Sequence, residues 1–327
     1  MKLGIAGAGA IVPDFLAAAA RLPAWEVAAL CGTPRHREQA QALGAAHGIP
    51  AVVTDYAQML RDPSLDFVYI AVPNHLHYAF ARQALEAGRH VICEKPFCSN
   101  LRQARELAVL AEARGLYLFE AISNQYLPNY EKTRALLPAL GRVRVATLNF
   151  SQYSRRYDAF CQGALPPVFD PQKSGGALMD LNLYNLYFLV GLFGAPQSLH
   201  YFANLERGID TSGVLLLHYP GMQASLTAAK NCAAPCLVQL QGDRGCLRCD
   251  GPANSYASFT FQPNGGEATA YALNDAPERL YYELARFADI FVRRDRQACR
   301  DAMDRSLLVQ ALLDGARRQA GIPIMDG

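Results

Sequence analysis

In the first 120 or so residues, short apolar runs alternate with segments in which apolar residues recur at helical spacing. The runs predict strands and the intervening segments predict helices. Such alternation predicts parallel βαβ units, with helices on both faces of a doubly wound sheet. The predicted strands are Leu3–Ala6, Val27–Cys31, Ala51–Val53, Phe67–Val72, His90–Cys93 and Leu116–Glu120, and the predicted helices are Ala10–Arg21, Pro34–His47, Tyr56–Leu60, His75–Ala87 and Asn100–Ala113.

The pattern changes after Glu120, where longer strand-like runs dominate and turns separate them. This half is predicted to be α+β with a largely antiparallel sheet. We therefore predict a Rossmann domain over residues 1–122 and a substrate-binding and oligomerisation domain over residues 123–327. The strands predicted here are Arg142–Ser151, Gly213–Tyr219, Gln223–Lys230 and Cys236–Gln241, and the helices are Gly176–Phe193, Pro277–Val292 and Met303–Ala320.

Composition narrows the class of protein. A chain of 327 residues that is 51% hydrophobic can bury two domain cores. Its 31 basic and 29 acidic residues include no long Lys/Arg run, so nucleic acid is not an expected partner. Nine scattered cysteines indicate a reducing compartment, and we expect a cytoplasmic protein. The apolar stretch Ala177–Phe193 is too short for a membrane span and contains Asp180, so no transmembrane segment is expected.

Two cysteine pairs offer a zinc site as an alternative. Their spacings are Cys232-x3-Cys236 and Cys246-x2-Cys249. The second pair lies in a strand-like segment, where residues three apart point to opposite faces. No H-E-x-x-H spacing is present either. We therefore expect no metal.

A glycine motif follows the first predicted strand and precedes the first helix. In Gly7-x-Gly9-x-x-Val12, Gly7 permits a tight turn and Gly9 lets a dinucleotide approach the backbone. Ala10 and Ile11 begin the helix, whose N-terminal N–H groups attract phosphate. Val12 replaces the usual Gly or Ala and is expected to crowd the helix against the sheet. The context predicts a dinucleotide site.

The end of the second strand bears on the choice of cofactor. NAD enzymes usually place there a carboxylate that binds the adenosine ribose. This chain has Gly32 and Thr33 instead, followed by Arg35, and a 2′-phosphate can bind to Thr33 and Arg35. This favours NADP(H) over NAD(H). The alternative is that Arg35 is a solvated helix residue.

Two further segments lie at the carboxyl ends of predicted parallel strands, where ligands bind in open α/β sheets. The first contains Pro73, Asn74 and His77, and the second is Glu94-Lys95-Pro96. From spacing alone, a solvated turn is an equally good interpretation of the charged pair.

These residues together resemble the glucose-fructose oxidoreductase, inositol dehydrogenase and rhizopine catabolism (Gfo/Idh/MocA) superfamily, over nearly the whole chain. Glu94-Lys95-Pro96 matches its first signature, and the segment from Gly175 to Tyr184 matches Gly-Gly-x-x-x-Asp-x-Gly-x-His/Tyr. Asn182 departs from the glycine of that signature. Tyr184 replaces the commoner His, as in members similar to glucose-fructose oxidoreductase and dimeric dihydrodiol dehydrogenase.

The resemblance implies roles for these residues. Lys95 reaches the reacting oxygen, Glu94 and Asn74 fix the cofactor ribose, and His77 supports the loop, with a Lys95–Pro96 bond that is often cis. Asp180 and Tyr184 are four apart on a predicted helix and share a face. Tyr184 is the expected general acid/base, because a neighbouring ammonium favours an ionised phenol.

The substrate is expected to lie against the second domain. The stretch from Tyr153 to Arg156, together with Lys173, is predicted to line the substrate side. Glu120 ends the last Rossmann strand and is predicted either to face the same cleft or to belong to a hinge.

We expect an enzyme that transfers a hydride between NADP(H) and a carbinol or carbonyl carbon of a sugar, polyol or diol. Two alternatives stay open: a catalytically silent NAD(P)-binding sensor or regulatory protein, and a redox-neutral enzyme with a tightly held cofactor. The family resemblance also implies a homodimer or homotetramer.

Overall fold

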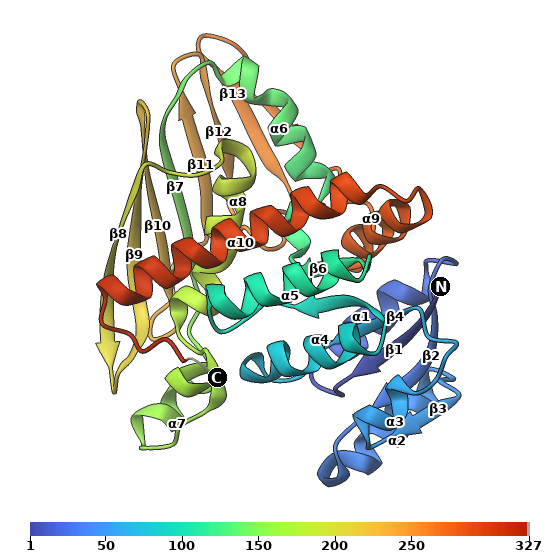
Figure 1. Ribbon diagram of the computed structural model, residues 1–327. Coiled ribbons are helices and arrows are strands. Elements are labelled where there is room, and N and C mark those ends of the chain that lie inside the picture. Colours follow the sequence, from blue (N-terminus) through green and yellow to red (C-terminus); the bar gives the residue numbers. More distant parts are fainter. Residues whose placement is uncertain (326–327) are drawn as a thin grey trace. The chain divides into compact units, whose positions relative to one another are not determined.

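The computed structural model describes residues 1–325, which form two compact units (Figure 1). The first unit comprises Met1–Ile122 and Glu278–Leu307, and the second comprises Ser123–Pro277 and the described residues from Leu308 onward. The chain thus returns to the first unit near its end, whereas the predicted division at residue 122 was contiguous.

The first unit is built on a six-stranded parallel sheet in the order β3-β2-β1-β4-β5-β6. This order confirms the Rossmann prediction. The strands read as continuous apolar runs because both faces of the sheet are covered. They are β1 (Lys2–Ala6), β2 (Glu26–Cys31), β3 (Ala51–Val53), β4 (Phe67–Ile70), β5 (His90–Glu94) and β6 (Leu118–Ala121).

Helices cover both faces of this sheet. On one face α3 (Tyr56–Leu60), α4 (His77–Glu86), α5 (Leu101–Ala113) and the start of α10 (Arg296–Gln319) enclose an apolar core. On the other face, α1 (Val12–Ala20) and α9 (Tyr281–Val292) pack through aromatic rings. α2 (Arg37–Ala46) lies against β3.

The returning helix α9 completes the aromatic side of the first unit. Phe287 stacks on Phe119 at 4.4 Å between ring centroids, and Phe291 packs edge-on against Phe67 at 5.0 Å. The indole Nε1 of Trp25 donates to the carbonyl of Leu284 at 3.1 Å. Residues more than 150 positions apart in sequence therefore share one core.

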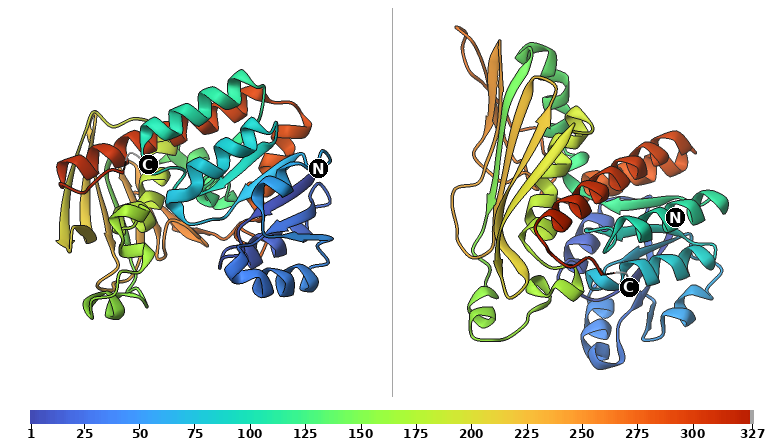
Figure 2. Two further views of the ribbon diagram at one scale, coloured as in Figure 1. Left: turned by 60° about the horizontal axis from the view of Figure 1, so that its bottom comes forward. Right: turned by 60° about the vertical axis from the view of Figure 1, so that its left-hand side comes forward.

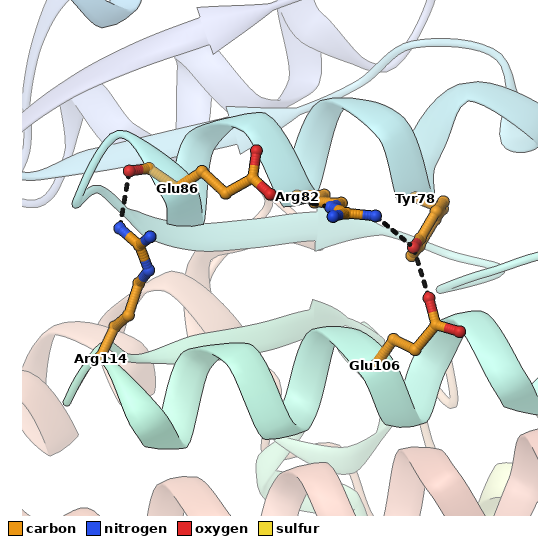
Figure 3. A network of polar contacts seen from close by, with 5 residues as sticks. All are labelled: Tyr78, Arg82, Glu86, Glu106 and Arg114. Atoms are coloured by element: carbon orange, nitrogen blue, oxygen red, sulfur yellow. Dashed lines mark hydrogen bonds and ion pairs between the residues drawn. The ribbon is translucent and has the colours of Figure 1, made fainter.

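Polar side chains link α4 to α5 at the surface (Figure 3). Tyr78 donates to Glu106, and the Arg82 guanidinium contacts both the Tyr78 hydroxyl at 3.2 Å and Glu86 at 2.9 Å. Arg114 donates to the Glu86 carbonyl at 2.7 Å. These groups are exposed, so each contact contributes about 1 kcal/mol at most to stability.

The second unit contains an eight-stranded sheet in the order β14-β13-β12-β11-β7-β10-β9-β8. One interior pair, β7 with β10, is parallel and the other pairs are antiparallel, which confirms the largely antiparallel prediction. The strands are β7 (Val143–Ser151), β8 (Ser198–Glu206), β9 (Ile209–Tyr219), β10 (Met222–Ala229), β11 (Leu237–Gly242), β12 (Gly245–Cys249), β13 (Phe259–Pro263) and β14 (Thr269–Tyr271).

One face of this sheet carries two helices of the second unit. α6 (Pro128–Leu140) packs on β12 and β13, and α8 (Leu183–Phe193) packs on β7 (Figure 2). On the opposite face, Phe202 is 57% exposed, Leu216 41% and Val145 39%. Their neighbours in sequence, Tyr201, Leu215 and Ala146, are buried, as the alternation of a strand requires.

The largest differences from the predicted helices lie in two segments. The segment predicted as a helix over Gly176–Phe193 begins with a π-helical turn, Leu178–Asn182, before α8. The last helix begins at Arg296 rather than Met303, because its first two turns carry charged residues that hide the apolar spacing. The apolar segment Pro171–Phe193 is long enough to cross a membrane, but 78% of its most apolar window is buried inside the protein.

Candidate functional site

The turn after β1 requires a glycine at position 7. Gly7 has φ +111°, and its N–H donates to the Cys31 carbonyl at 2.8 Å. A Cβ on Gly7 would lie 2.4 Å from the Ala71 carbonyl oxygen. The turn therefore sits between the ends of β1, β2 and β4, where only a glycine fits. A Cβ on Gly9 would meet only this same oxygen, at 3.8 Å, so the backbone there is open to a ligand.

The helix that follows starts as the motif predicts. Ala10 is exposed, Ile11 is the N-cap residue and Val12 is the first residue of α1. The Val12 side chain is completely buried, so the core accommodates the branched residue that replaces Gly or Ala. The exposed helix start next to an open glycine backbone fits a phosphate group.

Gly32, Thr33 and Arg35, which are expected near the adenosine ribose and its 2′-phosphate, follow the end of β2. Gly32 is buried, and a Cβ there would lie 2.7 Å from that of Ala40. The Thr33 hydroxyl contacts His36 Nδ1 at 3.0 Å. Arg35 is exposed in the 3-10 turn Pro34–His36.

His77 connects the loops that follow β4 and β5. Its ring nitrogens lie 2.8 Å from the Pro96 carbonyl oxygen and 2.9 Å from that of Val72. Burial lowers the pKa of His77, although both carbonyls favour its protonated form. His77 is therefore placed to hold the loop carrying Asn74 next to Lys95 and Pro96. Pro73 is exposed and precedes the short 3-10 turn Asn74–Leu76.

Glu94 ends β5 with its carboxylate already engaged. The Tyr69 hydroxyl donates to Glu94 Oε1 at 2.6 Å, and the Lys95 N–H donates to Oε2 at 3.2 Å. Burial raises the pKa of Glu94, while the Tyr69 bond and the Lys95 charge oppose the shift. The Lys95–Pro96 peptide bond is cis.

Two more carboxyl groups are buried in the first unit. Glu120 is 4% exposed and accepts the Phe97 N–H at 3.1 Å, which gives this residue a role inside the Rossmann core. Glu283 on α9 is 1% exposed, and burial together with nearby Glu94 raises its pKa well above the usual range. No local sequence pattern distinguishes Glu283, because its proximity to Glu94 arises only when α9 packs in the first unit.

In the second unit, Gly175 and Gly176 precede the π turn. A Cβ on Gly175 would lie 2.8 Å from the Pro167 carbonyl oxygen, and one on Gly176 would lie 2.1 Å from Asp210 Oδ1. The other Asp210 oxygen accepts the Leu178 N–H at 2.6 Å and the Tyr201 hydroxyl at 2.7 Å. The glycine pair thus lets a buried carboxylate bind the first turn of the helix.

The π turn carries Asp180, whose carboxylate is paired. Lys230 Nζ bonds Asp180 Oδ2, and the lysine side chain is 4% exposed whereas that of Asp180 is 31% exposed. π turns often occur at functional sites. Lys230 was not a predicted site residue.

Tyr184 is the second residue of α8, after Leu183, and is 5% exposed. Its carbonyl accepts from Asn124 Nδ2 at 2.9 Å. Asn182, the departure from the family glycine, donates to the Leu226 carbonyl at 3.0 Å and accepts from Asn185. Asn185 in turn donates to the Thr227 carbonyl at 3.1 Å. The two asparagines fix this helix to β10.

A cavity of about 360 Å³ opens beside Asp180. Tyr153 and Arg156, two of the residues expected on the substrate side, line this cavity. Lys173, the third of those residues, pairs with Asp170 at 3.1 Å. Its volume is in the range of small-molecule sites. The lining residues are Gln152, Tyr153, Ser154, Arg155, Arg156, Val168, Asp180, Leu181 and Lys230.

Among the described residues, the four cysteines of the alternative zinc site form no disulfide bonds and no metal-binding cluster. Cys232 is exposed, Cys249 is buried, and all nine cysteines are free. Within residues 1–325, no group of three or more His, Cys, Asp or Glu side chains is arranged to hold a metal ion.

Comparison with known families gives two adjacent matches. Residues 1–122 match the model of an oxidoreductase family with an NAD-binding Rossmann fold, and residues 131–248 match the GFO/IDH/MocA C-terminal domain.

Individual proteins are similar along the whole chain. Scyllo-inositol 2-dehydrogenase (NADP(+)) IolU of Bacillus subtilis is 32% identical over 98% of both chains. Trans-1,2-dihydrobenzene-1,2-diol dehydrogenase of Xenopus tropicalis is 27% identical over 98% of both. A solved 3-ketoreductase from Actinomadura kijaniata, in complex with NADP and TDP-benzene, has the same fold with a TM-score of 0.84 and 24% identity over 98% of this chain and 97% of its own.

Proposed function

The chain belongs to the GFO/IDH/MocA oxidoreductase family, and from this premise we propose that it interconverts a carbinol and a carbonyl group of a sugar, polyol or diol. The named relatives act on an inositol and on a dihydrodiol, both of which present CH–OH groups. The reaction is NAD(P)-dependent hydride transfer.

One observation carries the proposal. Residues from both family signatures lie where a cofactor or a substrate can bind. Lys95 follows β5 of the Rossmann unit, and Asp180 borders a polar cavity in the second unit. Ligands bind at the carboxyl ends of strands in such sheets. A polar cavity with cationic and anionic side chains suits a hydroxylated molecule.

The residues divide the work. The Gly7–Gly9 turn and the start of α1 bind the cofactor phosphates, while Glu94 and Asn74 bind the ribose beside the nicotinamide. When bound, the nicotinamide gives or accepts the hydride. Lys95 donates a hydrogen bond to the reacting oxygen, Tyr184 moves its proton, and Asp180 orients the substrate hydroxyls. Tyr153 and Arg156 contact the rest of the substrate.

NADP(H) is the preferred cofactor in this proposal. The segment Gly32-Thr33-Pro34 places no carboxylate at the end of β2, and Arg35 is exposed beside it. A guanidinium forms charge-assisted bonds to a 2′-phosphate. The name of the Bacillus subtilis relative, which specifies NADP(+), supports the same preference.

The protein is proposed to be a homodimer or homotetramer that associates through the second-unit sheet. Phe202, Leu216 and Val145 are exposed on one face of that sheet, and exposed apolar side chains on a strand surface favour association. Nine free thiols support a cytoplasmic location.

The test is a substrate panel of inositols, aldoses, ketoses and vicinal diols, assayed with NADP(H) and NAD(H) at the nicotinamide absorbance band. We expect reversible turnover of at least one hydroxylated class, and loss of turnover in Lys95→Met. Cofactor binding without turnover would support the silent regulatory protein instead. Nicotinamide absorbance in the protein as purified, unchanged by added substrate, would support redox-neutral chemistry.

A further inference from the structure

We propose that Lys230 is a positioning residue that fixes the Asp180 carboxylate for substrate binding; the inference rests on the proposed function. Lys230 lies directly after β10, and neither signature of the family includes it. It also lines the cavity beside Asp180. The pair therefore belongs to the wall that the substrate contacts.

The backbone holds Lys230 on two sides. Its N–H donates to the Thr211 carbonyl at 2.7 Å, and its carbonyl accepts the Ser154 N–H at 2.9 Å. Thr211 belongs to β9, and Ser154 follows β7. The Cα of Lys230 is thus fixed by both neighbouring strands, so only the side chain has freedom to lose when the ion pair forms.

The side chain is enclosed as well. Lys230 Nζ lies 5.4 Å from the ring centroid of Phe169, which is itself completely buried and stacked on Phe160. An ammonium over an aromatic face is attracted by the ring quadrupole. With the stem buried and the ring behind it, the charge of Lys230 is directed to Asp180.

The two members of the Lys230–Asp180 ion pair differ in their exposure to water. The lysine is almost completely removed from water, whereas the Asp180 side chain keeps 31% of its exposure. A buried ammonium without a partner is strongly unfavourable, whereas a carboxylate that water reaches can be hydrated. Lys230 therefore holds one Asp180 oxygen, and a substrate hydroxyl can donate to the exposed part of the same carboxylate.

The consequence is a fixed hydrogen-bond acceptor. Without the ammonium, the partly exposed Asp180 side chain would have more rotamers open to it, and the substrate would have to select the productive rotamer on binding. The ion pair selects one of them beforehand. Loss of Lys230 should thus weaken reaction of the substrate without affecting the cofactor, which binds to residues of the first unit.

A double-mutant cycle tests this inference, using the panel compound that the parent enzyme turns over fastest. We expect Lys230→Met to lower kcat/KM about 10- to 100-fold, the effect of one hydrogen bond to a charged group. Asp180→Asn should lower it at least as much, and the double variant should match Asp180→Asn within about threefold, because the two side chains act as a unit. The Kd for NADPH should stay within about twofold of the parent value.

Lys132→Met is the matched control. Lys132 also lies over an aromatic ring, with Nζ 5.1 Å from the Tyr271 centroid, but it does not line the cavity. This variant should keep the parent kcat/KM. Where Lys230→Met does not fold by circular dichroism, Lys230→Gln replaces it in the cycle.

The inference is overturned by a folded Lys230 variant whose kcat/KM stays within threefold of the parent, or by losses that multiply in the double variant. A parent enzyme that turns over no panel compound contradicts the proposed function, and this inference with it. These results are distinct, because the first two require an active parent enzyme.

Discussion

The carboxylate of Asp210 occupies the space into which a side chain on Gly176 would project. A Cβ there would lie 2.1 Å from Asp210 Oδ1, and Gly176 has φ +106°. Asp210 also accepts the Leu178 N–H at the start of the π turn that carries Asp180. The glycine signature thus contributes to the placement of the helix.

Gly176→Ala should therefore destabilise the protein by about 3 kcal/mol, from a strained φ and a clash with a buried carboxylate. Urea unfolding measures the change. Gly163→Ala is the matched control, because Gly163 has φ +99° but nothing lies within 4 Å of its Cβ position. Equal losses in the two variants would show that φ strain alone explains the glycine.

The same carboxylate predicts a pH dependence of stability. Burial raises the pKa of Asp210 to about 6, against the bonds from Leu178 and Tyr201. A folded-state pKa above the unfolded value stabilises the protein below about pH 4, and this contribution is lost as pH rises to 6. Asp210→Asn should remove this pH dependence. The free energy of unfolding of the variant should therefore rise by roughly 2–3 kcal/mol relative to that of the parent as the pH increases from 4 to 7. Parallel stability curves for the two proteins would contradict the assignment.

Tyr184→Phe keeps the ring and removes the hydroxyl. We expect a folded protein with parental NADPH affinity and a turnover rate lower by about two orders of magnitude, the usual contribution of a general acid/base. Steady-state rates at saturating cofactor measure this. A near-parental rate in Tyr184→Phe combined with an inactive Asp180→Asn would assign the proton to Asp180 or to water.

Arg35→Ala should weaken NADPH binding about 10- to 100-fold and leave NADH binding unchanged, because only NADPH carries a 2′-phosphate for the guanidinium. Fluorescence titration with both cofactors measures the two affinities. Arg37→Ala is the control, since its guanidinium contacts Thr54 at 3.4 Å. NADH binding as tight as NADPH in the parent would contradict the preference itself.

Phe202→Glu should convert the proposed dimer or tetramer into smaller species, because it places a charge on the exposed face of the second-unit sheet. Light scattering after gel filtration measures the mass. Leu165→Glu, which changes a residue of similar exposure (46%) outside the sheet, should leave the mass unchanged. A parent protein that is monomeric at micromolar concentration would contradict the proposed oligomer.

The sequence predicted the first unit well for a physical reason. Its strands are buried on both faces, so Phe67–Ile70 and the centre of His90–Glu94 read as apolar runs bounded by turns. β8 was missed because most of its side chains are at least partly exposed and their polarity does not alternate cleanly. The signature residues Lys95, Asp180 and Tyr184 came from the family resemblance.

Residues whose importance depends on tertiary contacts carried no local signal. Lys230 is a single lysine after an apolar strand, and its partner Asp180 lies 50 positions earlier. Glu283 lies on a helix that the sequence assigned to the second domain, whereas the fold groups it with Glu94 and Glu120. Long-range pairing of this kind is not encoded in periodicity.

Because the chain returns to the first unit near its end, part of the core of this unit is synthesised late. Phe67 and Phe119 leave the ribosome long before α9 supplies Phe291 and Phe287 to cover them. At ordinary elongation rates of about 5–20 residues per second, that interval is roughly ten to forty-five seconds. During that interval the nascent Rossmann sheet lacks the aromatic cover that α9 supplies, and exposed apolar surface of this kind makes incompletely folded chains prone to aggregation.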